Sequence, residues 1–578
     1  MHSIGSFTSC AENLTEVLDR AAAASNQRRE LGITLLDNRG RESDFLGYDA
    51  FARSVRQGAG RWRTLGLGPG ERVLICLPTS WEFLDAWLGC VLVGALPVAL
   101  APPGALGSPT AQVKKALQIC SSIDAAWLIA PKMLVDEAQR LAEEDSSNRV
   151  GARVIDVADW SRTTPTDGTD VRAEPGETAF LQLTSGSTGL PRAVEISHEA
   201  IVHNAMAIHY AVAAIDGAPC DHLVSWLPLY HDMGLIGCFF NSLINHTPLD
   251  LLTPRSFLAR PWIWLEATSR RTNVMSPAPN FAYQLCVERV SADRAKALDL
   301  RPFRHILSGS EMVRPETVEA FLEHFAPAQV DPTRFRASYG LAEATLGVSI
   351  ESSGRGVHTQ TVADVDTVAL GSPMTDVEVR VVDPASTGAP DWSNLEALPD
   401  GQVGAVMMRS PALMTGYFRD LEATNEVMRN GWLDTGDLGL VHDGETYLTG
   451  RRKEILILNG VNVMPHEIEW VAEGVSAAGG SERCGAFSVL DEQGERPVLV
   501  METTLKDHEA LQDLHRRVDS AVGRALSHPL SELIFVRRGS IPRTSSGKVQ
   551  RRALREDYAA ARLDRVEFDP DADVATSS

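Results

Sequence analysis

The eight cysteines of this 578-residue chain never form a CxxC pair, so the sequence has neither zinc-knuckle spacing nor a disulfide framework. They resemble the small buried residues of a protein in a reducing compartment. Cations are also scarce, because 54 lysines and arginines face 76 acidic residues, for a net charge of −22. This balance argues against binding along a nucleic-acid backbone, although a local basic pocket can still hold a nucleotide.

Repeats, targeting segments and membrane spans are missing as well. No period of about 20 to 50 residues recurs, which argues against a solenoid or propeller. Residues 1–20 lack a basic stretch followed by an apolar core, so we expect no usual signal peptide and a cytoplasmic protein. The uncharged stretch Ala86–Val113 is broken by Gly94 and Pro97, and is interpreted as a helix end and a short strand rather than a membrane span.

The apolar segments predict an α/β protein with largely parallel sheets. Strand-like runs at Val73–Leu77, Leu96–Leu100, Ala126–Ile129 and Leu223–Leu227 alternate with helical stretches. Since single hydrophobic cores stop growing at roughly 250 to 300 residues, the chain needs at least two domains.

The charged turn Gly450–Glu454 precedes an apolar strand, Ile455–Leu458, and marks the expected domain boundary. We expect a large N-terminal domain over residues 1–452, a small α+β C-terminal domain over 453–567 and a disordered acidic tail over 568–578. Three polar, turn-rich segments are interpreted as linkers: Ser161–Thr178, Glu351–Thr367 and Asp383–Gln402.

The segment Thr184–Gly189, TSGSTG, contains no side chain larger than threonine, so its amides and hydroxyls can approach an anion closely. It joins two predicted strands, Thr178–Leu183 and Ala193–Ile196, which favours a phosphate-binding loop over a flexible linker. It is not a P-loop: the only Gly-Lys pair, Gly547-Lys548, is followed by valine and has no glycine five residues earlier.

Two further motifs are ambiguous when each is taken alone. His231-Asp232 at a strand end, with Gly234 leaving room behind it, is either a turn pair that satisfies itself or part of a site. Tyr339 and Glu343 are either surface residues at a helix start or an aromatic that stacks on a base and a carboxylate that binds a metal.

Two motifs nearer the C-terminus are equally open in isolation. Asp437, in a tight glycine turn, either forms an Asx turn or accepts hydrogen bonds from sugar hydroxyls. Lys548 lies in a small-residue loop near the end of the folded chain and is either part of a cationic surface patch or a reactive amine.

The joint order of these motifs decides between the alternatives. TSGSTGLPRAV, PLYHDMG, YGLAEAT, DTGDLG, GRRKEILILNGVNVMPHEIE and PRTSSGK follow one another from Thr184 to Lys548. This order resembles the adenylate-forming superfamily of acyl-CoA synthetases, luciferases and peptide-synthetase adenylation domains. The forms LPLYHDMGLIG, SPAPNFAYQLC and YGLAEATLGVS are most similar to the fatty acyl-AMP ligases.

The resemblance implies the adenylate-forming enzyme fold with a mobile C-terminal lid, and ATP-dependent, Mg²⁺-dependent conversion of a carboxylic acid to an acyl-adenylate. The implied ATP-binding residues are Thr184, Ser185, Gly186, Ser187, Thr188, Gly189, Arg192, Gly309, Ser310, Glu311, Tyr339, Gly340, Asp437 and Arg451. The implied acyl-pocket residues are Met233, Gly234, Asn280, Phe281 and Thr345.

The remaining roles also come from the resemblance. His231 faces the acyl carboxylate, Glu343 matches the magnesium ligand, Glu454 the hinge and Lys548 the catalytic lysine. An ammonium placed at the α-phosphate stabilises the transition state more than the ground state. The chain departs from the usual pattern at Arg192, where the family has lysine, and at Glu454, where it often has aspartate.

The acceptor of the acyl group is open at this stage. The resemblance implies a carrier-protein thiol, but the segment Ile350–Ser372 is shorter than the insertion that fatty acyl-AMP ligases carry there, which favours CoA as the alternative acceptor. A non-catalytic nucleotide-binding relative is disfavoured because Lys548, Glu343 and Asp437 are all present. An amino-acid adenylation domain is disfavoured because His231-Asp232 has the spacing of the fatty-acid enzymes.

Overall fold

The computed structural model describes residues 11–102, 108–144, 151–184, 191–214, 217, 219–362, 365–458, 461–476, 483–491, 494–526, 530–544 and 547–567. The chain divides into two compact units. The first unit holds most of the chain up to Leu448, and the second begins at Thr449 and also includes Gly436–Leu438. The domain limits at residues 452 and 567 stay predictions.

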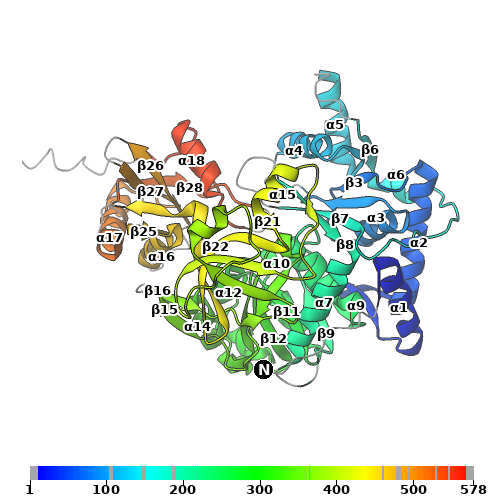
Figure 1. The fold of residues 1–578 in the computed structure, drawn as a ribbon, viewed down its shortest axis with the longest axis horizontal. Coiled ribbons are helices and arrows are strands. Elements are labelled where there is room, and N and C mark those ends of the chain that lie inside the picture. Colours follow the sequence, from blue (N-terminus) through cyan, green and yellow to red (C-terminus); the bar gives the residue numbers. More distant parts are fainter. Residues whose placement is uncertain are drawn as a thin grey trace, which may run out of the picture. The chain divides into compact units, whose positions relative to one another are not determined.

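The largest sheet of the first unit has nine strands, in the order β17-β14-β13-β12-β11-β9-β10-β1-β2 (Figure 1). Its six strands from β13 to β1 are parallel, and the antiparallel strands β2, β14 and β17 complete it. The strands are β1 (Gly32–Leu36), β2 (Glu42–Gly47), β9 (His222–Ser225), β10 (Leu249–Leu251), β11 (Val274–Ala278), β12 (Phe303–Ser308), β13 (Phe335–Gly340), β14 (Gly347–Ile350) and β17 (Ser372–Pro373).

A second sheet of seven strands has the order β20-β8-β7-β4-β3-β5-β6. Its strands are β3 (Arg72–Ile75), β4 (Leu96–Ala99), β5 (Ala125–Ala130), β6 (Arg153–Asp156), β7 (Thr178–Leu183), β8 (Ala193–Ser197) and β20 (Gly416–Tyr417). Strands β7 to β6 are parallel, whereas β8 is antiparallel to both β7 and β20. The expected α/β class, with largely parallel sheets, is therefore confirmed.

Helices cover both faces of the seven-stranded sheet. Alternate side chains of β3 point to opposite faces, so Val73 joins the core with helices α1 (Leu14–Gln27), α2 (Tyr48–Leu65) and α3 (Trp81–Leu92), whereas Leu74 joins the core with α4 (Pro109–Ser122) and α5 (Lys132–Glu144) (Figure 1). Helix α7 (His198–Ala213) packs against β8 of this sheet and against β14 of the nine-stranded sheet.

Several predictions from composition are confirmed. Helix α3 begins after the Ser80 N-cap and ends before Gly94, whose φ of 76° suits a helix stop, and β4 follows it. The seven cysteines among the described residues are buried, and none of them forms a disulfide. In the part of the chain that the structure describes, no helix is long and apolar enough to cross a membrane.

The other helices of the first unit are short. They are α6 (Val157–Arg162), α8 (Asp232–Gly234), the π-helix η2 (Leu235–Phe240), α9 (Asn241–Ile244), α10 (Pro254–Ala259), α11 (Trp262–Ser269), α12 (Asn280–Arg289), α13 (Ala292–Ala297), α14 (Pro315–His324) and α15 (Leu421–Val427), with 3-10 turns η3 (Ala326–Ala328), η4 (Pro332–Arg334), η5 (Ala342–Ala344) and η6 (Pro384–Gly388).

A third sheet contains β18 (Glu378–Val382), β19 (Gly404–Arg409), β22 (Trp432–His442), β21 (Met428–Arg429) and β23 (Glu445–Arg451), and β15 (Thr359–Val362) pairs with β16 (Val365–Val368). The second unit contains the pair β24 (Leu456–Leu458) and β25 (Val461–Val463) and the sheet β26 (Cys484–Asp491), β27 (Gly494–Thr503) and β28 (Glu532–Arg537). Its helices are η7 (Arg452–Glu454), α16 (Pro465–Ser476), α17 (His508–Leu526) and α18 (Arg551–Ala559).

Two local expectations are wrong. The expected linker Glu351–Thr367 contains most of the hairpin β15–β16, because a local antiparallel pair can form from mostly polar residues even where turn residues surround them. The expected linker Asp383–Gln402 is turn-rich as predicted, with the single 3-10 turn η6 that Asp383 caps. Asp437 lies within strand β22 rather than in a tight turn. Its neighbour Gly436 has a φ of 73°, but this does not end the strand.

Candidate active site

The site is built at the carboxyl ends of four adjacent parallel strands, β9, β11, β12 and β13. The segments after these strands carry His231 to Gly234, Asn280 and Phe281, Gly309 to Glu311, and Glu343 to Thr345. The carboxyl ends of parallel strands meet at one edge of a sheet, where ligands bind in open α/β folds. Residues that are far apart in the sequence are therefore gathered along one edge.

After β9, a turn fixes His231. Its Nδ1 lies 2.7 Å from Asp232 Oδ1, and the Met233 N–H donates to the same oxygen at 2.7 Å. The turn pair considered in the sequence is thus present, and when Nδ1 carries the proton, Nε2 is the acceptor nitrogen of the neutral ring. Glycine is needed at position 234, since a Cβ there would overlap the Pro228 carbonyl oxygen. The turn is also tied to β7 because the Gln182 side chain donates to the Tyr230 carbonyl at 3.3 Å.

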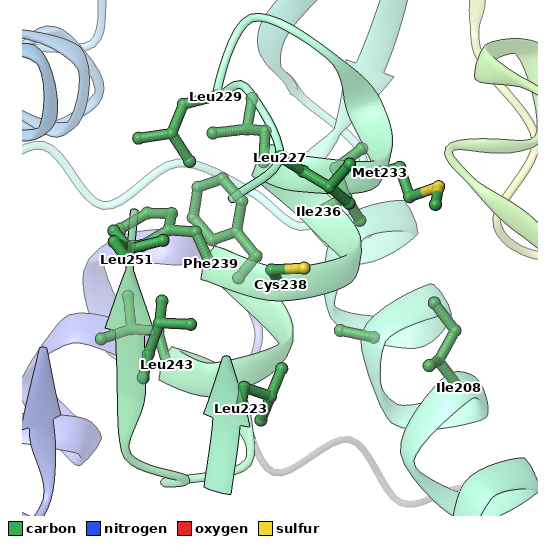
Figure 2. Close-up of a cluster of buried hydrophobic side chains, with 14 of the residues drawn as sticks. Ile208, Leu223, Leu227, Leu229, Met233, Ile236, Cys238, Phe239, Leu243 and Leu251 are labelled. Atoms are coloured by element: carbon green, nitrogen blue, oxygen red, sulfur yellow. The ribbon is translucent and has the colours of Figure 1, made fainter. Parts of the chain in front are cut away.

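The side chains before and after this turn are anchored in the apolar core. Figure 2 shows Leu227, Leu229, Ile236 and Phe239 gathered around η2, with Met233 at the edge of the cluster. Met233 is buried, and Ser310 Oγ lies 3.3 Å from its sulfur. The end of β9 is therefore in contact with the segment after β12.

Contacts also join the segments after β11 and β12. The Phe281 N–H, in the first turn of α12, donates to Glu311 Oε1 at 2.7 Å. Asn280 Oδ1 accepts from the Arg314 N–H at 3.0 Å, and the Asn280 amide donates to Thr317 Oγ1 at 3.3 Å. Asn280 and Glu311 therefore hold the two segments together, in addition to any contact with a ligand.

The segment after β13 is tight and strained. A Cβ at Gly340 would overlap the Leu346 carbonyl oxygen, so the chain can fold back there only with glycine. Thr345 has φ 65° and ψ −56°, and the Leu346 N–H donates to the Ala344 carbonyl at 2.7 Å, which makes a γ-turn of the strained kind. Such strain in a β-branched residue persists only when the surroundings hold it, and it is concentrated at functional sites.

Asn204 and Tyr417 help to hold this segment, and both were missed in the sequence. Asn204 of α7 is buried; its amide donates to the carbonyls of Gly347 and Ala344 at 2.9 and 3.3 Å, and its Oδ1 accepts from the Gly347 N–H at 3.0 Å. The Ala412 carbonyl accepts from the buried Thr345 hydroxyl at 2.7 Å. The one available signal for Asn204 was an amide on the apolar face of a helix.

Tyr417, also missed, links Glu343 to Arg192. The Tyr417 hydroxyl donates to Glu343 Oε1 at 2.8 Å, and the Arg192 guanidinium carbon lies 5.0 Å from the centre of the Tyr417 ring. Burial, and then the Glu343 carboxylate, raise the pKa of Tyr417 above its ordinary value, so its hydroxyl remains a donor. The substitution of lysine by Arg192 thus places a planar cation on an aromatic ring.

In the second unit, Arg451 Nε lies 3.0 Å from Asp437 Oδ1, and Asp437 is buried. Glu454 ends the η7 turn that follows Arg451. Lys548 is partly exposed in a turn just before α18, where its N–H donates to Thr544 Oγ1 at 3.0 Å.

The structure therefore gathers the expected residues in two groups. The first unit brings together His231, Met233, Gly234, Asn280, Phe281, Gly309, Ser310, Glu311, Tyr339, Gly340, Glu343, Thr345 and, through Tyr417, Arg192. The second pairs Asp437 with Arg451 and carries Glu454 and Lys548. Thr184 directly follows strand β7, and Ser185, Gly186, Ser187, Thr188 and Gly189 lie outside the described residues.

Comparison with known proteins places this geometry in a family. The model of the AMP-binding enzyme family matches residues 18–418. The chain belongs to the AMP-binding enzyme family. The match covers the phosphate-loop segment and every candidate residue of the strand-edge site in the first unit.

Two similar relatives and one solved structure extend this AMP-binding enzyme match over most of the chain. A Caulobacter vibrioides protein, named provisionally as an acyl-CoA synthetase, is 31% identical over 95% of each chain. The long-chain-fatty-acid–AMP ligase FadD26 of Mycobacterium tuberculosis is 33% identical over 86% of this chain and 89% of its own. A structure from a study of the fatty acyl-adenylate ligases of E. coli and L. pneumophila has a TM-score of 0.85 and 29% identity, and covers 96% of this chain and 99% of its own.

Proposed function

We propose that this protein uses ATP to convert a fatty or related lipophilic carboxylic acid to an acyl-adenylate, with release of pyrophosphate. The observation that carries the proposal is the strand-edge site. It gathers the candidate adenine and acyl residues and connects Glu343, through Tyr417, to Arg192 at the exit of the phosphate loop. The similarity to FadD26, a fatty-acid–AMP ligase, supports the same activity.

The reaction requires one bond to form and one to break. A carboxylate oxygen of the acid attacks the α-phosphorus of ATP, and the bond from that phosphorus to the bridging oxygen of pyrophosphate breaks. Negative charge on the non-bridging oxygens is stabilised by Lys548, and Arg192, which follows the phosphate loop in the sequence, holds the departing phosphates. His231 orients the acyl carboxylate, and Asp437 with Arg451 holds the ribose.

The donor set at Glu343 fits a magnesium ion. One carboxylate oxygen accepts from Tyr417, which orients the group and leaves the other oxygen for a cation. Mg²⁺ is usually held by one or two carboxylates together with substrate phosphates. When bound, the ion neutralises phosphate charge; the chain's own part is to hold Glu343 in place through Tyr417.

The division of labour between domains is part of the proposal. Residues 1–452 bind ATP and the acid, and residues 453–567 form a lid that carries Lys548 and turns about Glu454. Withdrawal of Lys548 admits a thiol, so that one site serves two steps. The buried cysteines of the described residues, which form no disulfide, support a cytoplasmic location.

The acceptor is proposed to be the phosphopantetheine thiol of an acyl carrier protein. The likeness to FadD26 and to the fatty acyl-adenylate ligase structure supports it. A second candidate is CoA, and two observations favour it: the short segment Ile350–Ser372 and the similarity to the Caulobacter protein.

The test is product analysis by mass spectrometry. Purified protein is incubated with ATP, magnesium and a panel of carboxylic acids, with and without CoA, beside the variants Lys548→Ala and Lys506→Ala. We expect acyl-AMP that is lost in Lys548→Ala and retained in Lys506→Ala, whose side chain is exposed on the second unit. Acyl-AMP that persists with CoA supports the carrier-protein acceptor, and acyl-CoA supports the second candidate. No acid-dependent product from any acid would overturn the proposal.

A further inference from the structure

The backbone around Lys548 is held by a compact set of hydrogen bonds. The Thr544 N–H donates to the Lys548 carbonyl at 2.8 Å, and the Lys548 N–H donates to Thr544 Oγ1 at 3.0 Å. The Arg543 guanidinium donates to the Gly547 carbonyl at 2.9 Å. The position of the Lys548 backbone is therefore fixed relative to the residues that precede it.

The residues after Lys548 are anchored in turn on the sheet of the second unit. Leu554 of α18 is fully buried in a cluster with Phe487 and Val500, and Val549 packs against the same cluster. A Cβ at Gly485 of β26 would overlap Leu554, so α18 lies directly on the strand. A displacement of α18 would therefore displace the Lys548 turn as well.

Arg551, the first residue of α18, makes three carboxylate contacts. Its Nε and one Nη donate to the two oxygens of Glu469 at 2.8 and 2.7 Å, and its other Nη donates to Glu454 Oε2 at 2.6 Å. Burial opposes ionisation of Glu469, but the Arg551 guanidinium holds the pKa of that carboxyl below its ordinary value. Glu469 also accepts from the Ala486 N–H at 2.9 Å.

The two carboxylates differ in what they can do. The Glu469 side chain is 6% exposed and accepts with both oxygens from one edge of the guanidinium, which suits a permanent structural pair, whereas the Glu454 side chain is 35% exposed and accepts from the remaining nitrogen only. The charge of the partly buried guanidinium is already balanced by Glu469, without a second carboxylate. The additional contact goes to the residue at which the hinge is predicted.

We propose that Arg551 is a positioning residue, which transmits the backbone conformation at Glu454 to the Lys548 turn and so sets where the lysine ammonium lies. This inference rests on the proposed function, in which Lys548 acts in adenylation. It assigns to Arg551 and Glu454 a role that neither fold stability nor ligand contact requires.

The first test is a double-mutant cycle. Single-turnover formation of acyl-adenylate is measured for the wild type, Arg551→Lys, Lys548→Ala and the double variant, with Arg552→Lys as the matched control on the same helix. Lysine at position 551 keeps the positive charge but cannot make the paired hydrogen bonds of the planar guanidinium. We expect Arg551→Lys to lower the rate on the order of 10- to 100-fold, with the KM for ATP and acid within about 2-fold, because misplacement of a catalytic group acts on the transition state. In the Lys548→Ala background the same substitution should have no further effect. An equal loss in both backgrounds would overturn the proposal.

Glu454→Gln provides a second variant, because its partly exposed side chain can change without leaving a buried charge unpaired. We expect a loss of adenylation rate in the same direction, with no further loss when Glu454→Gln is combined with Arg551→Lys. A wild-type rate would count against the proposal. A measurement independent of activity is labelling of Lys548 with an amine-reactive ester, followed by peptide mass spectrometry with Lys506 as internal reference. We expect the labelling of Lys548 to change by at least about 3-fold in both variants, because the access of the reagent to its amine is altered. Unchanged labelling of Lys548 refutes the inference, whatever the wild type produces. A wild type that makes no acyl-adenylate refutes only the proposed function.

Discussion

At the residue scale, Lys548 is the position from which the largest chemical effect is expected. Replacing it with alanine removes a preorganised cation from the place where charge gathers, and donors of this kind are worth on the order of 100- to 1000-fold in rate. We expect that loss in acid-dependent exchange of labelled pyrophosphate into ATP, with the KM for the acid little changed. Lys506→Ala, on the same unit, should match the wild type. A loss of less than about 10-fold would remove Lys548 from the catalytic role.

Asn204 is the second residue-scale position. Its buried amide bonds the backbone of Gly347 and Ala344, and alanine there removes both side-chain bonds to Gly347 and one of the two bonds to the Ala344 carbonyl, at a cost of about 1–3 kcal/mol. We expect Asn204→Ala to lower both the unfolding midpoint and the adenylation rate, because the strained turn at Thr345 loses part of what holds it. Asn245→Ala is the control, since its amide bonds α7 and α9 backbone away from that turn. Full activity in Asn204→Ala would show that the turn is held by other contacts.

The residues that sequence reasoning found and missed differ in a physical way. Glycine and charged residues in ordered motifs, such as Gly234 and Glu343, carry their chemistry in their type and spacing. Asn204 and Tyr417 act because the fold brings α7 and β20 to the segment after β13, from 140 and 74 residues away in the chain. No local pattern marks such a contact, so only the structure reveals these partners.

At the element scale, the packing of α2 on α3 contains a buried carboxyl group. Asp85 Oδ2 accepts from Ser54 at 2.7 Å, while Oδ1 has no hydrogen-bond partner within the described ranges, and burial raises the pKa of Asp85 to about 6. The folded state therefore keeps a proton that the unfolded state loses above about pH 4. The stability it contributes is present below that pH and is lost as the pH rises through about 6.

Asp85→Asn tests this pH dependence. The amide cannot ionise, so we expect the variant to be more stable than the wild type at pH 8, by up to about 3 kcal/mol, and the difference to shrink towards pH 4. Unfolding midpoints measured across this pH range check it. The control is Asp136→Asn, on the exposed face of α5 beside Lys132. A difference that is constant with pH would show that Asp85 is already ionised in the folded protein.

Strands were predictable where both of their faces are buried, and helices were predictable where a capping residue is present. Strand β4 is a continuous apolar run between two parallel neighbours, and α3 begins at a serine cap and stops before a glycine. The hairpin β15–β16 was not predictable in this way, because its residues are mostly polar and its pairing is local. Turn-forming residues around it resemble a linker when no core is visible in the sequence.

At the scale of the whole molecule, the order of motifs along the chain predicted the family, because that order depends on the whole site rather than on one local fold. The relation between Lys548 and the strand-edge site could not be predicted in the same way. In the proposed mechanism it depends on the conformation at Glu454, and a few backbone dihedrals in a hinge can move a domain without any change in the motifs. The proposed access of an acceptor thiol depends on that same conformation.

The proposed domain limit at residues 452 and 453 can be tested by limited proteolysis. Arg451, Arg452 and Lys453 are consecutive trypsin sites at the proposed hinge, and Arg451 is held by Asp437 whereas Lys453 is exposed. We expect early cleavage at Lys453, seen by intact mass, and a change in its rate when ATP and an acid substrate are added, because a turn of the lid alters the backbone that the protease must bind. Lys453→Gln should remove the early cut and leave later cuts unchanged. Early cleavage elsewhere, with no cut in 451–453, would place the flexible junction outside the proposed hinge and require another origin for the movement of Lys548.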